Sequence, residues 1–436
     1  MTAPQSPWSP FLSPGRIGSR TAATSPVEAQ RRSEFHKDYD RIIFSSAFRR
    51  LSDKTQVVPF PKSDYTRRRL THSLEVSCVG RSLATEIYDG DQSGLKEQIA
   101  QGDFEAIVAT ACLAHDIGNP PFGHFGERAI QDWAHNWIMT HPDNPLTPAE
   151  RQDLLKFEGN AQSFRVLTRL QMANRYGGMR LTAASLGAVI KYPRPSLTPG
   201  KSRYRKHGVF QDDWTLFSAV FEASGRSLEA SGEFSRHPLA WLSEAADDIC
   251  YVIIDLEDGC KSGAIPLAEG IGILERIAPP ERRTDSIPDD DRLAMARALA
   301  INRLVQQAAV VFRSHFSEIL EGTFASSLVD LCPARDAYQT AKSVVFDKVF
   351  RSPRVLELEV GGYRAIQGLL EMLASAVLAQ RPNRLEDHLL SLFSLRIADD
   401  ATTYQKLLAC TDAVSGMTDR FCMEQFQKLT GYGNIL

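Results

Sequence analysis

The amino-acid sequence predicts an all-α protein that carries a few short strands. From Arg31 onward, apolar residues recur three and four positions apart through most of the chain, which is the spacing of one helix face. Alternation of apolar and polar residues is rare, and the best strand candidates lie near 189–192, 203–210 and 354–359. Hydrophobic residues make up 43% of the 436 positions, which is enough to fill a large core.

The two ends of the chain differ in composition. Residues 1–28 are rich in Pro and Ser, so we expect a disordered N-terminal arm. We expect residues 29–275 to form the main helical core, and residues 276–436 to form a helical C-terminal region packed on it. The polar stretch 278–291 (APPERRTDSIPDDD) is expected to be a linker between the two.

Three helices of the expected core each carry one apolar face. In chain order, these faces comprise His72, Val76, Val79, Leu83 and Ile87; then Phe104, Ile107, Val108, Ala111, Cys112 and His115; then Leu239, Leu242, Ala246, Ile249, Ile253 and Leu256. A further helix is expected in FEGNAQSFRVLTRL, which starts at Phe157. In the C-terminal region we expect helical segments at 290–320, 324–333, 335–350, 360–379, 385–397 and 402–430.

Charge and cysteine content exclude several classes of protein. The formal net charge is −3, so the chain is not a polycation that binds nucleic acid in bulk. The seven cysteines are scattered without a CxxC pair, which indicates reduced, mostly buried thiols. No apolar run approaches the roughly 20 residues of a membrane span, and the N-terminus lacks an apolar signal core. We therefore expect a cytoplasmic protein with no membrane partner.

An imidazole and a carboxylate stand side by side where the second apolar face ends. His115 completes that face, Asp116 follows it, and Gly118 with two prolines then stops the helix. Burying such a polar pair without partners costs on the order of several kcal/mol, so the pair needs partners elsewhere in the chain. Neighbouring imidazole and carboxylate groups are a ready pair of metal ligands.

The third apolar face has carboxylates beside it. Asp247, Tyr251 and Asp255 are spaced four residues apart and share one stripe, whereas Asp248 points about 100° away. Carboxylates are almost never fully buried unless they are paired, so these acids need partners, which salt bridges to arginines would also supply.

Together, His72, His115, Asp116 and Asp247 form a set of two imidazoles and two carboxylates. Such mixed donors suit first-row transition metals such as Mn, Fe, Co, Ni or Zn, and Mg less ideally. We expect a divalent ion, with Mg or Mn as the first choice and Co, Ni, Fe or Zn as alternatives. A lone histidine on an apolar face, such as His72, is also compatible with a hydrogen-bonded core residue.

Residues 192–213 (YPRPSLTPGKSRYRKHGVFQDD) contain three prolines, several Lys and Arg residues and no clear period. We interpret this segment as a long basic loop or hairpin, and loops of this length are more often functional than idle. Its positive charge is compatible with binding of single-stranded nucleic acid.

Six short motifs in this order resemble the bacterial deoxyguanosine triphosphate triphosphohydrolases and their relatives, which are HD-domain phosphohydrolases. The motifs are RRLSDKTQV, TRRRLTHSLEV, AHDIGNPPFGHFGE, FEGNAQ, EAADDICY and GMTDRF. The resemblance runs from about Arg41 to about Phe421. It implies an HD-domain helical core with additional C-terminal helices, and His72, His115, Asp116 and Asp247 as metal ligands.

The resemblance also implies roles for residues around the metal. His124 and Glu127 match a catalytic His/Glu pair, and their spacing lets the carboxylate hold one imidazole nitrogen while the other faces the substrate. Arg69, with help from Arg67, would meet the α-phosphate. A solvated basic turn is the alternative reading of these arginines.

Further contacts follow from the same resemblance. Gln56 and Asp255 would contact the sugar 3′-hydroxyl, Tyr251 would pack against the deoxyribose, and Lys191 with Tyr192 would hold the outer phosphates. The remaining matched polar residues are Asn160, Gln162 and Arg420; the first two would face the ligand or its neighbours, and a helix salt bridge is the alternative for the third.

The expected reaction is metal-dependent hydrolysis of dGTP, and of other deoxynucleoside triphosphates (dNTPs), to deoxynucleoside and triphosphate. Two alternatives stay open: an HD phosphohydrolase with another nucleotide specificity, and a regulatory protein that binds nucleotides or single-stranded DNA. The resemblance further implies a homo-oligomer, commonly a hexamer. In some relatives it also implies a dNTP activator at a second site, for which the basic segment 192–213 is the candidate here.

Overall fold

The computed structural model describes residues 6–17, 32–56, 67–172, 177–281, 286–350, 353–395 and 397–431. Within these ranges the secondary structure is helical, and β-structure is limited to isolated bridges such as the one between Pro195 and Val209. The prediction of an all-α fold is therefore confirmed. No helix in the described part of the chain is both long enough and apolar enough to cross a membrane.

One apolar core is built around the three helices whose faces the sequence predicts. All residues of those three faces are buried except His115, which is partly buried. The helices of this core are α4 (Arg69–Asp89), α5 (Gln101–Ala114), α12 (Ala240–Lys261), α13 (Leu267–Ile277), α14 (Asp289–Ser314) and α16 (Arg335–Val345). We call this cluster the α12 core; short helices α15 (Phe316–Glu321), η5 (Val329–Leu331) and η6 (Phe346–Phe350) border it.

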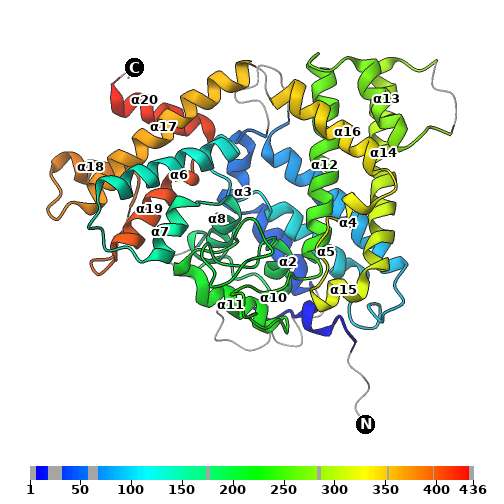
Figure 1. Ribbon diagram of the computed structural model, residues 1–436, viewed down its shortest axis with the longest axis horizontal. Helices are drawn as coiled ribbons and strands as arrows, with labels where there is room; N and C mark the ends of the chain where they lie inside the picture. Colours follow the sequence, from blue (N-terminus) through cyan, green and yellow to red (C-terminus); the bar gives the residue numbers. More distant parts are fainter. Residues whose placement is uncertain are drawn as a thin grey trace, which may run out of the picture.

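A second apolar core lies on the other side of the molecule in Figure 1. It forms because α17 packs its buried face, which includes Ile366, Leu369 and Leu373, against α6 and α19. The helices of this core, which we call the α17 core, are α6 (Gly123–Thr140), α7 (Pro148–Leu155), α17 (Pro353–Leu378), α18 (Arg384–Leu392), α19 (Thr403–Ser415) and α20 (Asp419–Thr430).

The helices of a smaller third core run from the middle of the view in Figure 1 to its lower edge. Its buried aromatic residues are Phe48, Phe164, Phe217, Phe221 and Phe234. Its helices are α2 (Glu34–Ile43), α3 (Ser46–Arg50), α8 (Gly159–Arg165), α10 (Ala183–Val189) and α11 (Trp214–Ala223), with short turns η1 (Ser9–Leu12), η2 (Leu51–Asp53), η3 (Val166–Leu170) and η4 (Gln211–Asp213) beside them.

The predicted short strands are wrong. Residues 354–359 belong to α17, and the apolar residues Leu356 and Val360 are 50% and 60% exposed instead of lining one sheet face. The segment 189–192 starts at Val189, the last residue of α10, and continues into the loop after it; residues 203–210 lie in a loop. The predicted helix at 324–333 is also wrong, because only the single turn η5 forms there. Short runs of alternating residues fit both periods, and packing decides between them.

The prediction that residues 1–28 are disordered is wrong for 6–17. Trp8 is buried, with its ring 5.7 Å from that of Phe104 and 6.3 Å from that of Phe312. Arg16 pairs with Asp38 at 2.8 Å. Residues 1–5 and 18–31 lie outside the described residues. The helices α14 and α16 share the α12 core with α4 and α5, while the proposed division of the chain at residue 275 stays a prediction.

Candidate active site

Three side chains converge from three helices of the α12 core. His72 on α4 places Nε2 3.1 Å from Oδ1 of Asp247 on α12. His115, the residue that ends α5, places Nε2 3.5 Å from the same oxygen. One ligand atom from each of these residues lies within 4.8 Å of the others. The structure thus brings together three of the four residues that the sequence predicts as metal ligands.

The fourth member, Asp116, lies beside this cluster. Its Oδ1 is 3.5 Å from His115 Nε2, outside hydrogen-bonding contact with that ring. The carboxylate accepts hydrogen bonds from the Arg69 guanidinium and from the Asn119 side-chain amide. Asp116 therefore reaches the cluster from the side and is held in place by two donors.

The state of His115 indicates what this centre can hold. Nδ1 donates to the carbonyl oxygen of Cys112 at 2.6 Å, so in the neutral ring the lone pair is on Nε2. Nε2 is buried and has no hydrogen-bond partner among the described residues. Burial lowers the pKa of His115, but Asp116 and Asp247 more than compensate and raise it. The centre therefore favours a cation at Nε2, which suits a metal ion as well as a proton.

The carboxylate of Asp247 is held ionised. Burial by itself would raise the pKa of Asp247, but His115 and His72 outweigh that effect and lower it to about 2. Asp248 points elsewhere: its Oδ2 accepts a hydrogen bond from Ser327 at 3.2 Å, and burial raises its pKa to about 7. The predicted distinction between the two neighbouring acids agrees with this geometry.

His124 and Glu127 form a pair at the start of α6. The imidazole Nδ1 donates to Glu127 Oε2 at 2.7 Å, and the His124 side chain is 79% exposed. The other carboxylate oxygen of the buried Glu127 accepts from the Gly159 backbone N–H at 2.7 Å. Burial raises the pKa of Glu127, but the His124 hydrogen bond and the nearby Lys206 outweigh it and lower the pKa. The ionised carboxylate fixes the ring and leaves Nε2 free to face solvent.

Arg69 lies between Asp116 and the His124/Glu127 pair. Its buried guanidinium contacts Asp116, and a Cβ added at Gly123 would lie 2.5 Å from its Nη2. The guanidinium thus lies against the turn that precedes His124. The predicted help from Arg67 is wrong in this geometry, because Arg67 is engaged by Glu257 at 2.8 Å and by two further carboxylates.

Lys191 and Tyr192 follow α10, and Lys191 lies near the carboxylates of Glu244 and Asp247. Lys191 Nζ pairs with Glu244 Oε1 at 3.1 Å; burial lowers the pKa of Lys191, but Glu244 outweighs it, with a smaller contribution from Asp247, and raises it. The ammonium also lies 5.8 Å from the Tyr192 ring centroid. Lys191 is therefore charged, although one carboxylate already engages it.

The predicted sugar contacts include two unpartnered oxygens. Gln56 Oε1 and Asp255 Oδ2 are buried and have no hydrogen-bond partner among the described residues. Burial, with Asp258, raises the pKa of Asp255 well above its ordinary value. Tyr251 is stacked on Phe350 with ring centroids 5.7 Å apart, and burial, with Asp255, raises the pKa of its hydroxyl.

The other matched residues make contacts within the protein. Asn160 donates to Glu158 at 2.7 Å, and Gln162 donates to Asp412 at 2.9 Å while its Oε1 lacks a partner among the described residues. Arg420 is 61% exposed and lies 3.6 Å from Asp53, as a surface ion pair would.

Sequence reasoning missed residues that the fold brings to this site. Lys206 of the basic loop pairs with Glu158 at 3.0 Å and contributes to the low pKa of Glu127. Arg194 and Arg203 of the same loop are occupied as well, by backbone carbonyls and by Glu233 respectively. Lys206 of this loop thus lies near the carboxylate of Glu127. The sequence predicted the basic loop, but it did not indicate that Lys206 would pair with Glu158, 48 residues away.

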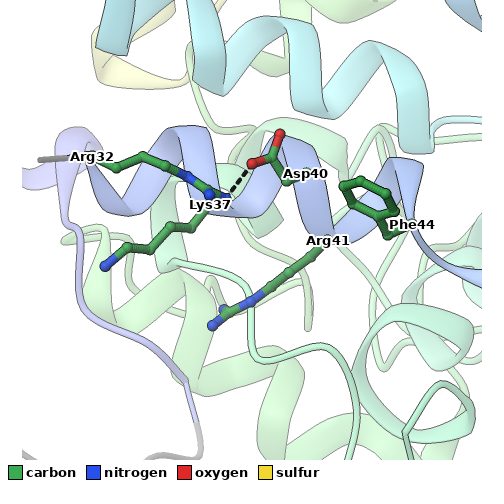
Figure 2. A pocket seen from close by; sticks show the side chains of 5 residues that line it. All are labelled: Arg32, Lys37, Asp40, Arg41 and Phe44. Carbon is green, nitrogen blue, oxygen red and sulfur yellow. Dashed lines mark ion pairs between the residues drawn. The ribbon is translucent and has the colours of Figure 1, made fainter.

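The hollow shown in Figure 2 is a separate feature on α2. It has a volume of about 490 Å³ and is lined by Arg32, Lys37, Asp40, Arg41 and Phe44. Arg32 pairs with Asp40 across it (Figure 2). None of the predicted site residues lines this hollow, so we place the candidate active site at the histidine and aspartate cluster.

Comparison with known proteins assigns the chain to a family. The HD domain model matches residues 69–146, and the phosphohydrolase-associated domain model matches residues 333–428. A deoxyguanosinetriphosphate triphosphohydrolase-like protein from Synechocystis is 41% identical over 97% of this chain and 99% of its own length. A protein of the same name from Pseudomonas aeruginosa is 38% identical over 97% of this chain and 98% of its own. The deoxyguanosinetriphosphate triphosphohydrolase of Salmonella paratyphi A is 33% identical over 91% of this chain and 93% of its own. This chain belongs to the deoxyguanosinetriphosphate triphosphohydrolase-like family of HD-domain phosphohydrolases.

Proposed function

We propose that this protein hydrolyses dGTP and other deoxynucleoside triphosphates to deoxynucleoside and triphosphate, with the help of a divalent metal ion. The observation that carries the proposal is the buried cluster of His72, His115 and Asp247, in which an imidazole nitrogen has no hydrogen-bond partner among the described residues. Relatives that match almost the full chain have names that state this activity or a likeness to it.

His72, His115 and Asp247 would hold the metal, with Asp116 as the fourth ligand. Mixed imidazole and carboxylate donors are compatible with Mg or Mn, and also with Co, Ni, Fe or Zn. A bound divalent ion lowers the pKa of water and polarises a phosphoryl oxygen. The protein's own contribution is to fix these ligands: Asn119 and Arg69 orient Asp116, and the Cys112 carbonyl orients His115.

His124 would transfer the proton in the reaction. Its ring is exposed on one side and held by Glu127 on the other, which is the arrangement a general base for water or a general acid for the departing 5′ oxygen requires. The ionised Glu127 stabilises the protonated form of the ring while the proton resides there. The Gly159 N–H keeps the carboxylate in position.

The triphosphate and the sugar would be bound by the groups around this centre. The Arg69 guanidinium lies between Asp116 and the His124 turn, where it would meet the α-phosphate, and the charged Lys191 with Tyr192 would meet the outer phosphates. The unpartnered oxygens of Gln56 and Asp255 fit hydroxyl donors of a sugar.

A product analysis tests the proposal. Each of the four dNTPs is incubated with the protein and Mg or Mn, singly and in mixtures, and the products are separated by chromatography. We expect deoxynucleoside and triphosphate in equal amounts, and no turnover after metal removal. Orthophosphate as the first product would instead favour a phosphohydrolase of another specificity. Absence of turnover, together with salt-dependent binding of single-stranded DNA that Asp116→Ala leaves unchanged, would favour a regulatory protein.

A further inference from the structure

A single buried carboxylate connects the C-terminal helices to two segments of the candidate active site. Asp419 is the first residue of α20 and is only 2% exposed. Its Oδ1 accepts from the backbone N–H of Phe122 at 3.0 Å, and its Oδ2 accepts from the backbone N–H of Thr55 at 2.9 Å. The two donors lie 297 and 364 residues away in the sequence.

Each of these backbone donors adjoins a residue that the proposed reaction uses. Phe122 precedes α6 with φ of 61°, a left-handed conformation that residues with a side chain rarely adopt, and Gly123 follows with φ of 56°. His124 is the next residue, so the direction of its backbone depends on this turn. Thr55 is directly followed by Gln56, whose side-chain oxygen is one of the unpartnered buried atoms.

A second buried contact supports the same turn from the same side. Lys54 donates through Nζ to the carbonyl of Asn119 at 2.5 Å and to the carbonyl of Ser415 at 2.8 Å. Asn119 in turn donates to Asp116, and the Phe122 ring lies against Gly362 of α17, where an added Cβ would be 2.5 Å away. The turn from Asn119 to Gly123 is thus clamped between the C-terminal helices and Arg69.

We propose that Asp419 is a positioning residue that sets the orientation of the His124/Glu127 pair and of Gln56 by fixing their backbone. It acts through the N–H groups of Phe122 and Thr55 and touches neither substrate nor metal. Its neighbour Arg420 lies on the surface, so Asp419 is the residue of the GMTDRF segment that serves the site. This inference rests on the proposed function for its effect on catalysis.

The test compares Asp419→Asn with Glu424→Gln, a matched control on the exposed side of α20, where Glu424 lies 3.8 Å from Lys428. In Asp419→Asn one acceptor becomes an amide donor that faces a backbone N–H. We expect kcat for dGTP to fall by about 10²-fold with KM changed less than about threefold, since misplacement of a catalytic group by about 1 Å has that effect. Hydrogen exchange of the amides from 119 to 126 should become faster in this variant alone.

Two readouts separate this inference from the proposed function. If the wild type does not hydrolyse any dNTP, the proposed function fails, and faster exchange confined to 119–126 in Asp419→Asn still supports the positioning role. If the wild type is active and Asp419→Asn keeps both its kcat and its exchange rates, the positioning role is refuted. Faster exchange spread equally over α6, α17 and α20 would also refute it, because that pattern indicates general loosening.

A longer side chain covers the case in which the asparagine variant does not fold. Asp419→Glu keeps the charge and lengthens the arm by one methylene, so it should keep the fold and shift the turn. We expect an intermediate loss of kcat with exchange again faster at 119–126. Wild-type kcat in Asp419→Glu, with wild-type exchange, would overturn the inference.

Discussion

Replacing Lys54 with methionine tests the buried polar junction between α19 and the active-site turn. Lys54 is 3% exposed, and its ammonium donates to the carbonyls of Asn119 and Ser415. Burial, together with the nearby Arg50, lowers the pKa of Lys54 from 10.5 to about 7. Methionine has a similar length and no charge, so Lys54→Met removes the titration while it keeps most of the packing.

The sign of the pH effect follows from the two pKa values of Lys54. In the folded protein the ammonium loses its proton near pH 7, whereas in the unfolded chain it keeps the proton up to about pH 10.5. Between these values the unfolded chain binds more protons, so the free energy of unfolding rises with pH. The cost of burying the charge is fully present below about pH 6. Integration over the two pKa values gives a gain of about 2 kcal/mol between pH 7 and pH 9.

The assay compares the thermal unfolding of the wild type and Lys54→Met in the same buffers from pH 6 to pH 9. The difference between the two proteins cancels every other group that titrates in this range. For a chain of this length that melts as one unit, about 2 kcal/mol corresponds to a rise of roughly 2 °C in the Tm difference, in favour of the wild type. A Tm difference that stays constant from pH 7 to pH 9 would refute the buried, readily neutralised state of Lys54.

Three further predictions address the proposed reaction. His115→Ala should abolish binding of Mn and turnover while the far-ultraviolet circular dichroism stays unchanged; turnover that persists would remove His115 from the metal site. Glu127→Gln should lower kcat for dGTP by about 10²-fold with little change in KM, and a change in KM alone would reject the proton-transfer role of the pair. Tyr251→Ala should reduce the preference for dGTP over GTP by about tenfold, and an unchanged ratio of kcat/KM would show that Tyr251 does not select the sugar.

Periodicity predicted the parts of the fold in which one apolar face decides the structure. The faces of α5 and α12 are long, so their helices and their burial followed from spacing, and the separation of Asp247 from Asp248 followed from helix geometry. Short segments were less informative. The alternating residues 354–359 fit a strand as well as a helix, and Trp8 anchors a Pro-rich segment whose composition indicated disorder.

The contacts of Lys54, Asp419 and Lys206 could not have been found from spacing. Lys54 and Asp419 use backbone groups as partners, and any residue type can supply a backbone N–H or carbonyl. Each stands in a polar stretch that reads as solvent-exposed, since charged residues are rarely buried. Lys206 was predicted as part of a basic loop, but its position beside Glu158 depends on the path of that loop. Only the tertiary structure shows that Lys54, Asp419 and Lys206 lie beside the candidate site.

The candidate site lies where two apolar cores meet, and this arrangement explains why so many polar contacts surround it. The metal-type cluster is carried by α4, α5 and α12 of the α12 core, whereas His124 and Glu127 are carried by α6 of the α17 core. Apolar packing within one core does not by itself fix the distance between the two groups, because each group is carried by a different core. The turn from Asn119 to Gly123 connects the two groups along the chain, and it contacts Asp116 and Arg69 on one side and Lys54 and Asp419 on the other. Directional hydrogen bonds made by buried polar side chains are suited to this task, since they specify position where non-directional apolar contacts specify only burial.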